Sequence, residues 1–185
     1  AELAGQPIED ALAGIAHVVV PGRLQRIDEG EDFLAIVDYA HKPAAVAAVI
    51  ATLRSEIKGR LCVVLGAGGD RDASKRAIMG REAARGSDLF IVTDDNPRSE
   101  DPAVIRAAVE AGAYELPTEE RGEVRNIGDR AAAIRAAIAW AEPGDAVLVA
   151  GKGHETGQNV NGVIHHFDDR EEVRAALQAR RTGSL

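Results

Sequence analysis

Cysteine is almost absent from the chain, in which Cys62 is the single example. One thiol cannot form a disulfide within the chain, and such sparing use of cysteine is typical of a reducing compartment. Because Cys62 lies inside the apolar run 61–65, we expect it to be a core residue. The first residues also lack the basic and then apolar pattern of a secretory signal, so we expect a cytoplasmic protein.

Long apolar runs and an excess of positive charge are missing as well. No stretch approaches the roughly 20 apolar residues that a membrane-spanning helix needs. The 185 residues include 22 Lys and Arg against 30 Asp and Glu, which gives a formal net charge of −8. Nucleic acids and anionic membranes bind basic surfaces. We therefore expect neither a nucleic-acid nor a membrane partner, and any phosphate site has to be local.

An initiator methionine is missing too, and the opening residues do not resemble a natural start, so we expect a piece of a longer protein. A short helical pattern runs from Pro7 to Ala16, and Pro21-Gly22 then breaks the chain. We place a domain boundary at this break. The remaining length suits one α/β domain of ordinary size.

Four apolar runs predict buried strands, at residues 33–38, 61–65, 89–92 and 146–150. Segments with helical spacing of apolar residues alternate with them, at 43–57, 74–84, 103–113 and 129–141. In the third helix we expect Val104, Ala108 and Val109 to face the core. Other predicted features are short strands at 23–27 and 124–127, a hairpin around Asn161-Gly162, and a capping box of Asp168 and Glu171 before the last helix. The alternation predicts a Rossmann-like α/β fold, with a mainly parallel sheet and helices on both faces.

Polar loops come directly after the predicted strands, at residues 38–42, 66–72, 95–98 and 151–155. Because the carboxyl ends of parallel strands meet at one edge of the sheet, where open α/β sheets bind ligands, we expect these loops to form one site. Arg98 offers a planar donor fork for a carboxylate or phosphate, whereas Asp94, Asp95 and Asn96 offer oxygens to an amine. Such a set suits a zwitterion, for example an amino-acid head group. The alternative is that Asp-Asn-Pro merely forms a turn, since these residues favour turns for backbone reasons.

Known nucleotide and metal motifs are incomplete in this chain. Arg71 stands where the third glycine of a dinucleotide fingerprint belongs, and neither glycine-rich loop supplies a P-loop. Gln158 replaces the second histidine of a zinc-protease helix, and His165 and His166 point to opposite faces of a predicted strand, so we expect no metal site. The chain therefore has no complete site of its own for ATP or Mg²⁺.

The sequence allows two interpretations for each of four polar side chains. His41 and Lys42 precede the predicted helix start at Pro43, so they could contact a phosphate or nucleotide, or form a solvated turn. Arg71 could reach a ligand or pair with its acidic neighbours. Glu155 could hold a substrate amine or cap the next segment.

Four segments, taken in order, resemble the C-terminal domain of the Mur ligase family: Val-Asp-Tyr-Ala-His-Lys-Pro at 37–43, Gly-Gly-Asp-Arg-Asp at 68–72, Asp-Asn-Pro-Arg at 95–98 and Gly-Lys-Gly-His-Glu at 151–155. By this resemblance, residues 21–185 form the amino-acid-binding ligase domain, and residues 1–20 resemble the tail of the family's central, ATP-binding domain. Within the family, the chain is most similar to members that add meso-diaminopimelate to UDP-N-acetylmuramoyl-L-Ala-D-Glu in peptidoglycan synthesis.

The resemblance implies an ATP- and Mg²⁺-dependent amide ligase, in which ATP phosphorylates a substrate carboxylate and the incoming amine attacks the acyl-phosphate. This domain would bring in meso-diaminopimelate, whose distal end carries an amine and a carboxylate. Arg98 would take the distal carboxylate with help from Asn96, and Asp95, Glu155 and the carbonyl of Gly151 would take the distal amine. The binding set that the resemblance implies is Arg71, Asp95, Asn96, Pro97, Arg98, Gly151 and Glu155.

For the nucleotide, the resemblance implies contacts from Arg23, Asp38, His41 and Lys42. It places no catalytic residue and no metal ligand in this chain. The implied partners are the UDP-muramoyl-dipeptide and the central and N-terminal domains of the same enzyme. Lysine-adding relatives generally differ at the Asp-Asn-Pro-Arg motif, and lysine would leave Arg98 unpaired, so this arginine marks a diaminopimelate site.

Two alternatives remain open. One is a related Mur-type, murein-peptide recycling or folate polyglutamate ligase domain that takes another amino acid, against which the Asp-Asn-Pro-Arg turn argues. The other is a non-catalytic Rossmann-like binding module, which would bind its ligand without neighbouring domains. The family's P-loop, its carbamylated magnesium-binding lysine and its UDP-binding domain have no counterpart here, so we expect the isolated chain not to catalyse ligation.

Overall fold

The computed structural model describes residues 20–185. The helix predicted from Pro7 to Ala16 lies outside the described residues. The division of the chain into residues 1–20 and 21–185 stays a prediction.

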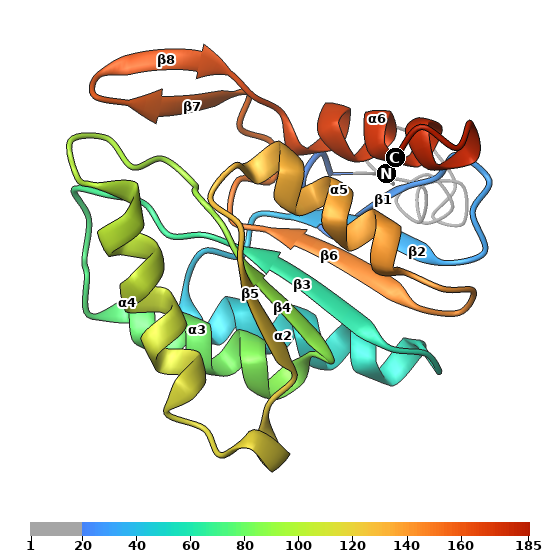
Figure 1. Ribbon diagram of the computed structural model, residues 1–185, viewed down its shortest axis with the longest axis horizontal. Coiled ribbons are helices and arrows are strands. Elements are labelled where there is room, and N and C mark those ends of the chain that lie inside the picture. Colours follow the sequence, from blue (N-terminus) through green and yellow to red (C-terminus); the bar gives the residue numbers. More distant parts are fainter. Residues whose placement is uncertain (1–19) are drawn as a thin grey trace, which may run out of the picture.

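The strands of the described chain are β1 (Gln25–Ile27), β2 (Leu34–Asp38), β3 (Leu61–Leu65), β4 (Leu89–Val92), β5 (Glu123–Asn126), β6 (Ala146–Ala150), β7 (Gly157–Val160) and β8 (Val163–His166). A central sheet has the order β1-β2-β6-β3-β4-β5 (Figure 1). Strand β1 is antiparallel to β2, and the other neighbours in this sheet are parallel. Strands β7 and β8 form a separate hairpin at the predicted Asn161-Gly162 turn, where both residues have positive φ.

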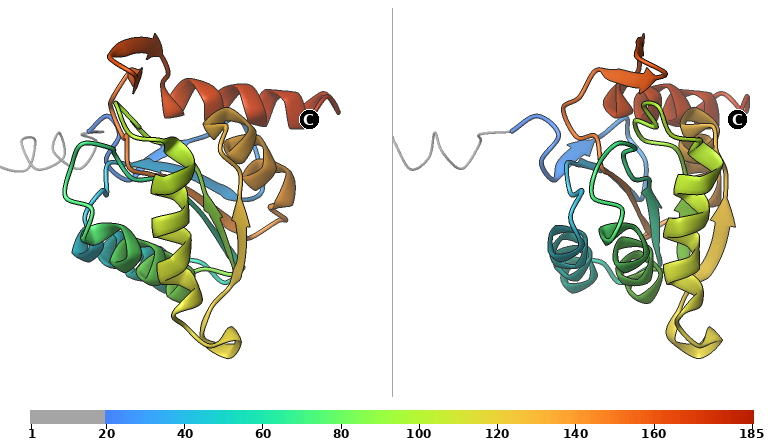
Figure 2. Two further views of the ribbon diagram at one scale, coloured as in Figure 1. Left: turned by 60° about the vertical axis from the view of Figure 1, so that its left-hand side comes forward. Right: turned by 90° about the vertical axis from the view of Figure 1, so that its left-hand side faces the viewer.

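The helices are α2 (Pro43–Glu56), α3 (Lys75–Gly86), α4 (Pro102–Tyr114), α5 (Arg130–Trp140) and α6 (Asp169–Arg181), with a 3₁₀ turn η2 (Thr118–Glu120). Helices α2, α3 and α4 cover one face of the sheet, and α5 and α6 cover the other (Figures 1 and 2). The Rossmann-like prediction is confirmed. Between residues 20 and 185, no helix combines the length and the apolar character needed to cross a membrane.

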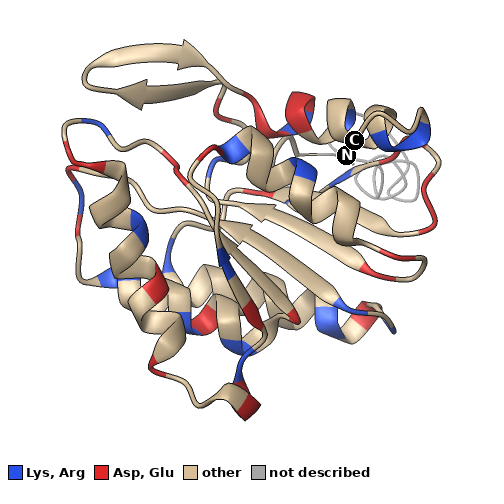
Figure 3. Cartoon of the chain, viewed as in Figure 1, with Lys and Arg blue, Asp and Glu red and all other residues tan. Residues whose placement is uncertain are grey.

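Strands β3, β4 and β6 are buried along their whole length, which is why their sequences contain no charged residue (Figure 3). Alternate residues face the two helix layers. Val63 packs in the cluster under α2, α3 and α4, whereas Cys62 and Val64 pack in the cluster under α5 and α6. Burial raises the pKa of the Cys62 thiol well above its usual range, so this cysteine is the core residue that was expected.

Helices α3 and α4 touch at their backbones. A Cβ atom on Gly80 would lie 1.8 Å from the carbonyl oxygen of Val109, and a Cβ atom on Gly112 would lie 1.8 Å from that of Ala77. No side chain fits at either glycine unless the helices move apart. This crossing fixes the two helices against each other.

The predicted inward face of α4 is partly wrong. Val104 is 59% exposed and Ala108 is half-buried, whereas Ile105 and Val109 are buried. The helix begins at Pro102. It packs against α3 in an orientation that turns the side chain of Ile105 toward the sheet and the side chain of Val104 toward solvent.

The predicted capping box of α6 is only half formed. Asp168 accepts a hydrogen bond from the backbone N–H of Arg170 at 2.9 Å. The carboxylate of Glu171 instead bonds to the exposed ring of His166 at 2.6 Å. Only the N-cap part of the motif therefore stabilises this helix.

Asp145, directly before β6, ties that strand to β3. Its carboxylate accepts hydrogen bonds from the backbone N–H of Arg60 at 2.8 Å, from Nη2 of Arg60 at 2.6 Å and from the backbone N–H of Glu142 at 2.9 Å. Burial alone raises the pKa of this carboxyl, but the hydrogen bonds from Arg60 and Glu142 outweigh burial and hold the pKa below its usual range.

We expect Asp145→Asn to lower the free energy of unfolding by roughly 1.5–3 kcal/mol at neutral pH, the range for hydrogen bonds to charged groups. Because the pKa of Asp145 is lower in the folded state, its contribution is complete above the unfolded pKa of about 3.9 and is lost as the pH falls through the folded-state pKa. Urea unfolding of both proteins from neutral pH down to about pH 2 measures this difference. Asp28→Asn, at an exposed pair with Arg26, is the control and should change stability by less than about 0.5 kcal/mol. A deficit of Asp145→Asn that does not shrink with acid would contradict the assignment.

Candidate functional site

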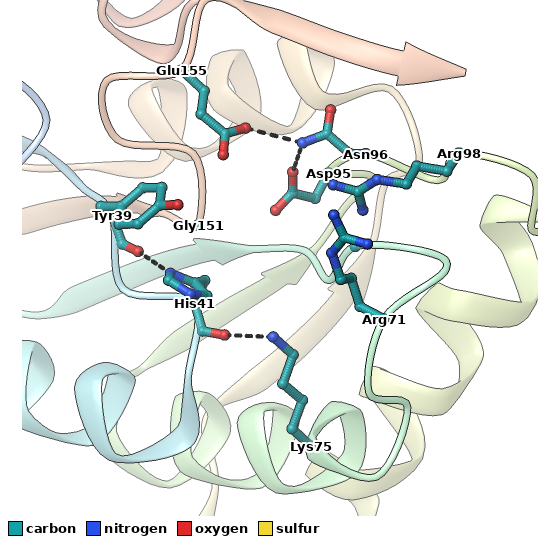
Figure 4. Close-up of a pocket in the computed structure, with 10 residues that line it drawn as sticks. Tyr39, His41, Arg71, Lys75, Asp95, Asn96, Arg98, Gly151 and Glu155 are labelled. Carbon is teal, nitrogen blue, oxygen red and sulfur yellow. Dashed lines mark hydrogen bonds between the residues drawn. The ribbon is translucent and has the colours of Figure 1, made fainter. Parts of the chain in front are cut away.

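The four polar loops meet at the carboxyl edge of the parallel sheet, as predicted. They enclose a cleft of about 290 Å³ (Figure 4). The cleft is lined by Tyr39, His41, Gly68, Arg71, Lys75, Asp95, Asn96, Arg98, Gly151 and Glu155. Segments that are far apart in the chain therefore form one site, because parallel strands deliver their following loops to the same edge.

One side of the cleft is acidic. Asn96 donates hydrogen bonds from Nδ2 to Oδ1 of Asp95 and to Oε2 of Glu155, both at 3.0 Å. Figure 4 shows the second oxygen of each carboxylate turned into the cleft. Gly151 has a φ of +115°, and a Cβ atom there would lie 3.2 Å from Oδ2 of Asp95. Glycine at this position therefore allows the carboxylate to lie close to the backbone.

The cleft also has a basic side, which begins beside Asp95. Arg98 donates from Nη1 to the carbonyl oxygen of Gly69 at 2.7 Å, and Arg71 donates from Nη1 to that of Asp70 at 3.0 Å. Figure 4 shows both guanidinium groups extending from different loops into the cleft and toward each other. These hydrogen bonds go to neutral carbonyl groups, so both charges stay available to an anion.

The β7–β8 hairpin holds the loop that carries Arg98. This arginine has a φ of +54°, which residues with a side chain rarely adopt. Its backbone N–H donates to the carbonyl of Asn159 at 3.0 Å, and its carbonyl accepts from the N–H of Asn161 at 2.7 Å. The N–H of Asn159 also donates to Oδ1 of Asn96 at 2.8 Å. The hairpin thus fixes residues from both sides of the cleft.

A buried ion pair lies beneath the site. The side chains of Arg130 and Asp169 are fully buried and share two hydrogen bonds, at 2.7 and 2.8 Å. Arg130 also donates to the carbonyls of Ala150 at 2.9 Å and Asp94 at 3.4 Å, each of which directly precedes a residue of the cleft. Burial alone lowers the pKa of Arg130, but Asp169 outweighs burial and raises the pKa above its usual value. The guanidinium therefore stays charged in the interior.

Three of the residues predicted to contact a nucleotide lie around Tyr39. Arg23 stacks on the ring of Tyr39, 4.5 Å from its centroid, and Lys42 is exposed at the N-cap of α2. His41 lines the cleft, and its Nδ1 lies 2.9 Å from the carbonyl oxygen of Tyr39. Because a carbonyl can only accept, Nδ1 carries the hydrogen and Nε2 is left for another partner.

Asp38 has a different role from the other three. Its carboxylate is buried and accepts hydrogen bonds from the backbone N–H of Leu24 at 2.8 Å and of Ala40 at 2.7 Å. Both oxygens are therefore used inside the chain. Asp38 shapes the loop after β2 through these bonds, and its nucleotide role stays a prediction.

A family model described as "Mur ligase, glutamate ligase domain" matches residues 22–153. The chain belongs to the Mur ligase family. The UDP-N-acetylmuramoyl-L-alanyl-D-glutamate–2,6-diaminopimelate ligase of Corynebacterium efficiens is 69% identical over 167 residues, which cover 89% of this chain and 32% of that protein. The ligase of the same name from Streptomyces coelicolor is 55% identical over 176 residues, which cover 95% of this chain and 35% of that protein. This Mur ligase chain thus spans about a third of the length of the curated relatives that it matches.

Solved structures agree with the Mur ligase fold. One structure of a UDP-N-acetylmuramoyl-L-alanyl-D-glutamate–2,6-diaminopimelate ligase matches with a TM-score of 0.80 and 40% identity, over 97% of this chain and 36% of that one. The folylpolyglutamate synthase of Mycobacterium tuberculosis, crystallised with ADP and AMPPCP, matches with a TM-score of 0.55 and 26% identity, over 79% of this chain and 33% of that one.

Most of the predicted substrate residues of this Mur ligase chain lie in one cleft. The exception is Pro97, which is buried and does not line the cleft. Its carbonyl lies against Gly69, where a Cβ atom would come within 1.9 Å of the oxygen, so Pro97 shapes the wall rather than reaching the interior. The binding roles themselves stay predictions.

Sequence reasoning did not assign site roles to Tyr39, Gly68 and Lys75, which line the cleft, and it missed three further residues that support the cleft. Lys152 is fully buried, and its position between two glycines after a buried strand is a pattern that could have indicated it. Gln158 donates from Nε2 to the carbonyl of Asp95 at 2.7 Å, although it was considered only as a replaced zinc ligand. Arg130 follows a helix cap, where arginine is usually exposed, so no local pattern indicates its burial.

We expect Asp169→Asn to destabilise the chain by about 3–5 kcal/mol, because it leaves the charge of Arg130 buried without its partner. The double variant Arg130→Met/Asp169→Leu removes both charges and should regain a large part of that loss. Urea unfolding at neutral pH compares the three proteins. If Asp169→Asn costs no more than the exposed control Asp28→Asn, the pair does not brace the fold.

Proposed function

We propose that the cleft binds the distal end of meso-diaminopimelate, and that the chain is the amino-acid-binding domain of an ATP-dependent amide ligase that adds this amino acid to UDP-N-acetylmuramoyl-L-Ala-D-Glu. The observation that carries the proposal is that two carboxylates, of Asp95 and Glu155, and two guanidinium groups, of Arg71 and Arg98, line one cleft of about 290 Å³. A side chain that ends in both an ammonium and a carboxylate is complementary to both sides.

The two arginines would bind the distal carboxylate, since guanidinium groups offer paired N–H donors in a plane. Asp95, Glu155 and the carbonyl of Gly151 would accept hydrogen bonds from the distal ammonium. Asn96 would also support the acidic side, because its Nδ2 donates to both carboxylates.

Binding at the distal end determines which amine of the ligand reacts. The carboxylates of Asp95 and Glu155 would stabilise the protonated form of the distal amine, and a protonated amine is not a nucleophile. The other amine would project from the cleft and be free to lose its proton. Holding it in place lowers the entropic cost of its attack on an acceptor.

The chain supplies only part of a nucleotide site. When bound by the longer protein, ATP would supply the activated form of the acceptor carboxylate. Arg23, His41 and Lys42 would face its phosphates from this chain, at the N-terminus of α2, where negative charge is favoured. Within residues 20–185 there is no cluster of three or more His, Cys, Asp or Glu that could hold a metal ion.

The names of the relatives support this substrate, since those from Corynebacterium efficiens and Streptomyces coelicolor are both 2,6-diaminopimelate ligases. Glutamate is less suitable, because its side chain ends in a carboxylate alone and would leave the acidic side of the cleft unmatched. A cytoplasmic location, expected from the cysteine content, is part of the same proposal.

Calorimetric titration of the chain with meso-diaminopimelate and with lysine tests the substrate. We expect meso-diaminopimelate to bind more tightly, and Arg98→Ala to weaken its binding roughly 10- to 150-fold, since a hydrogen bond to a charged group contributes about 1.5–3 kcal/mol. Lysine binding should change little, because lysine has no distal carboxylate. The control is Arg85→Ala, which removes an exposed arginine at the end of α3. Equal binding of the two amino acids to the unmodified chain would contradict the assignment.

The chain alone should not catalyse ligation. Incubated with ATP, Mg²⁺, UDP-N-acetylmuramoyl-L-Ala-D-Glu and meso-diaminopimelate, it is expected to form no amide and to release no phosphate, because the nucleotide contacts that it offers are incomplete. Mass spectrometry of the muramoyl peptide measures the product. Amide formation by the chain alone would show that catalysis does not depend on the other domains of the longer protein.

A further inference from the structure

Lys152 is a charged residue of the site that the proposed ligand contacts do not use. Its side chain is fully buried. Nζ donates to the carbonyl oxygen of Gly157 at 2.7 Å, and it lies 3.4 Å from Oε2 of Glu155, 3.4 Å from Oδ1 of Asn96 and 3.5 Å from Oδ1 of Asp95. These neighbours belong to the loops that form the acidic side of the cleft or to the hairpin that holds them.

These contacts divide the carboxylate oxygens into two sets. Lys152 and Asn96 contact Oδ1 of Asp95 and Oε2 of Glu155. The other oxygen of each carboxylate is directed into the cleft (Figure 4). An ammonium and an amide therefore anchor each carboxylate by one oxygen and leave the second oxygen for a ligand.

The acidic pair depends on a nearby cation. Asp95 and Glu155 share the amide of Asn96, and two carboxylates this close repel each other when both are ionised. Burying the charge of a lysine is also unfavourable when no group of opposite charge lies near it. Together the two carboxylates and Lys152 carry one net negative charge, which one ammonium ion balances.

Other charged groups face the same carboxylates. Arg130 lies beneath them and interacts with both through its charge, and Arg71, Arg98, His41 and Lys75 line the same cleft. In the part of the chain that the structure describes, however, Lys152 is the cation within ion-pair distance of both Asp95 and Glu155.

From these contacts we infer that Lys152 is the positioning residue of the acidic side: it keeps Asp95 and Glu155 ionised together and turned so that their outer oxygens accept one ligand ammonium. The inference rests on the proposed binding of a diamino acid. It adds that the charge of the site is tuned from inside the protein, by a residue that does not touch the ligand.

The first test needs no ligand. Lys152→Met keeps the length of the side chain and removes its charge. In carboxyl ¹³C spectra, we expect this variant to show one more carboxyl group titrating between about pH 5 and pH 8 than the unmodified chain, because the unbalanced pair takes up a shared proton. Lys152→Met/Glu155→Gln leaves a single carboxylate and should lose the additional titration. Identical titrations of Lys152→Met and the unmodified chain would overturn the inference.

The second test measures binding of meso-diaminopimelate over the same pH range by calorimetry in buffers of different ionisation enthalpy. Binding to Lys152→Met should release about one proton and weaken up to about tenfold for each unit of falling pH, since the ligand ammonium must displace that proton. The unmodified chain should release almost none. A purely structural role of Lys152 would weaken binding equally at every pH, and that result would also overturn the inference.

Lys58→Met removes the same charge from an exposed position after α2 and should match the unmodified chain in both tests. If Lys152→Met does not fold, Lys152→Gln replaces it, because glutamine keeps an N–H donor for the carbonyl of Gly157.

The outcomes of the two tests also distinguish the role of Lys152 from the substrate assignment. If the additional titration is present but the unmodified chain does not bind meso-diaminopimelate, the role of Lys152 in balancing the pair stands and the substrate assignment fails.

Discussion

The buried contact between Arg130 and Asp169 is the interaction on which the geometry of the site depends. Arg130 reaches the carbonyls of Ala150 and Asp94, at the ends of β6 and β4, and these strands are not neighbours because β3 lies between them. A guanidinium can donate to a carboxylate and to two separate carbonyls because it presents several N–H donors in one plane. The three N–H donors of a lysine ammonium all lie on one nitrogen, so they cannot reach groups that are as far apart. The loops after β6 and β4 carry the acidic side of the cleft. The buried guanidinium of Arg130 therefore fixes the distance between these two loops from beneath the site.

The two sides of the cleft are supported in different ways. The carboxylates of Asp95 and Glu155 are anchored by charged and amide donors, Lys152 and Asn96, so part of their charge is already balanced. The two arginines rest on main-chain carbonyls and keep their full charge. In a chain with a net charge of −8, this local concentration of positive charge would favour the approach of an anionic group.

Local sequence patterns were sufficient to predict the strands, because β3, β4 and β6 are buried on both faces and therefore consist of unbroken apolar runs. They were also sufficient to predict that the loops converge, since this follows from parallel strand direction. They failed at Val104, because the rotation of α4 is set by the contact of Gly112 with α3, which is a tertiary constraint. They failed again at Lys152 and Arg130. Long cationic side chains usually lie at the surface, and the burial of these two depends on partners far along the chain, which no local pattern contains.

The glycine contact between α3 and α4 bears on the loops that carry the two arginines of the cleft. Arg71 lies in the loop that enters α3, and Arg98 lies in the loop that enters α4. Because the two helices meet backbone to backbone at Gly80 and Gly112, a shift of one helix is resisted by the other. A movement of either loop that displaced its helix would therefore also displace the helix that follows the other arginine.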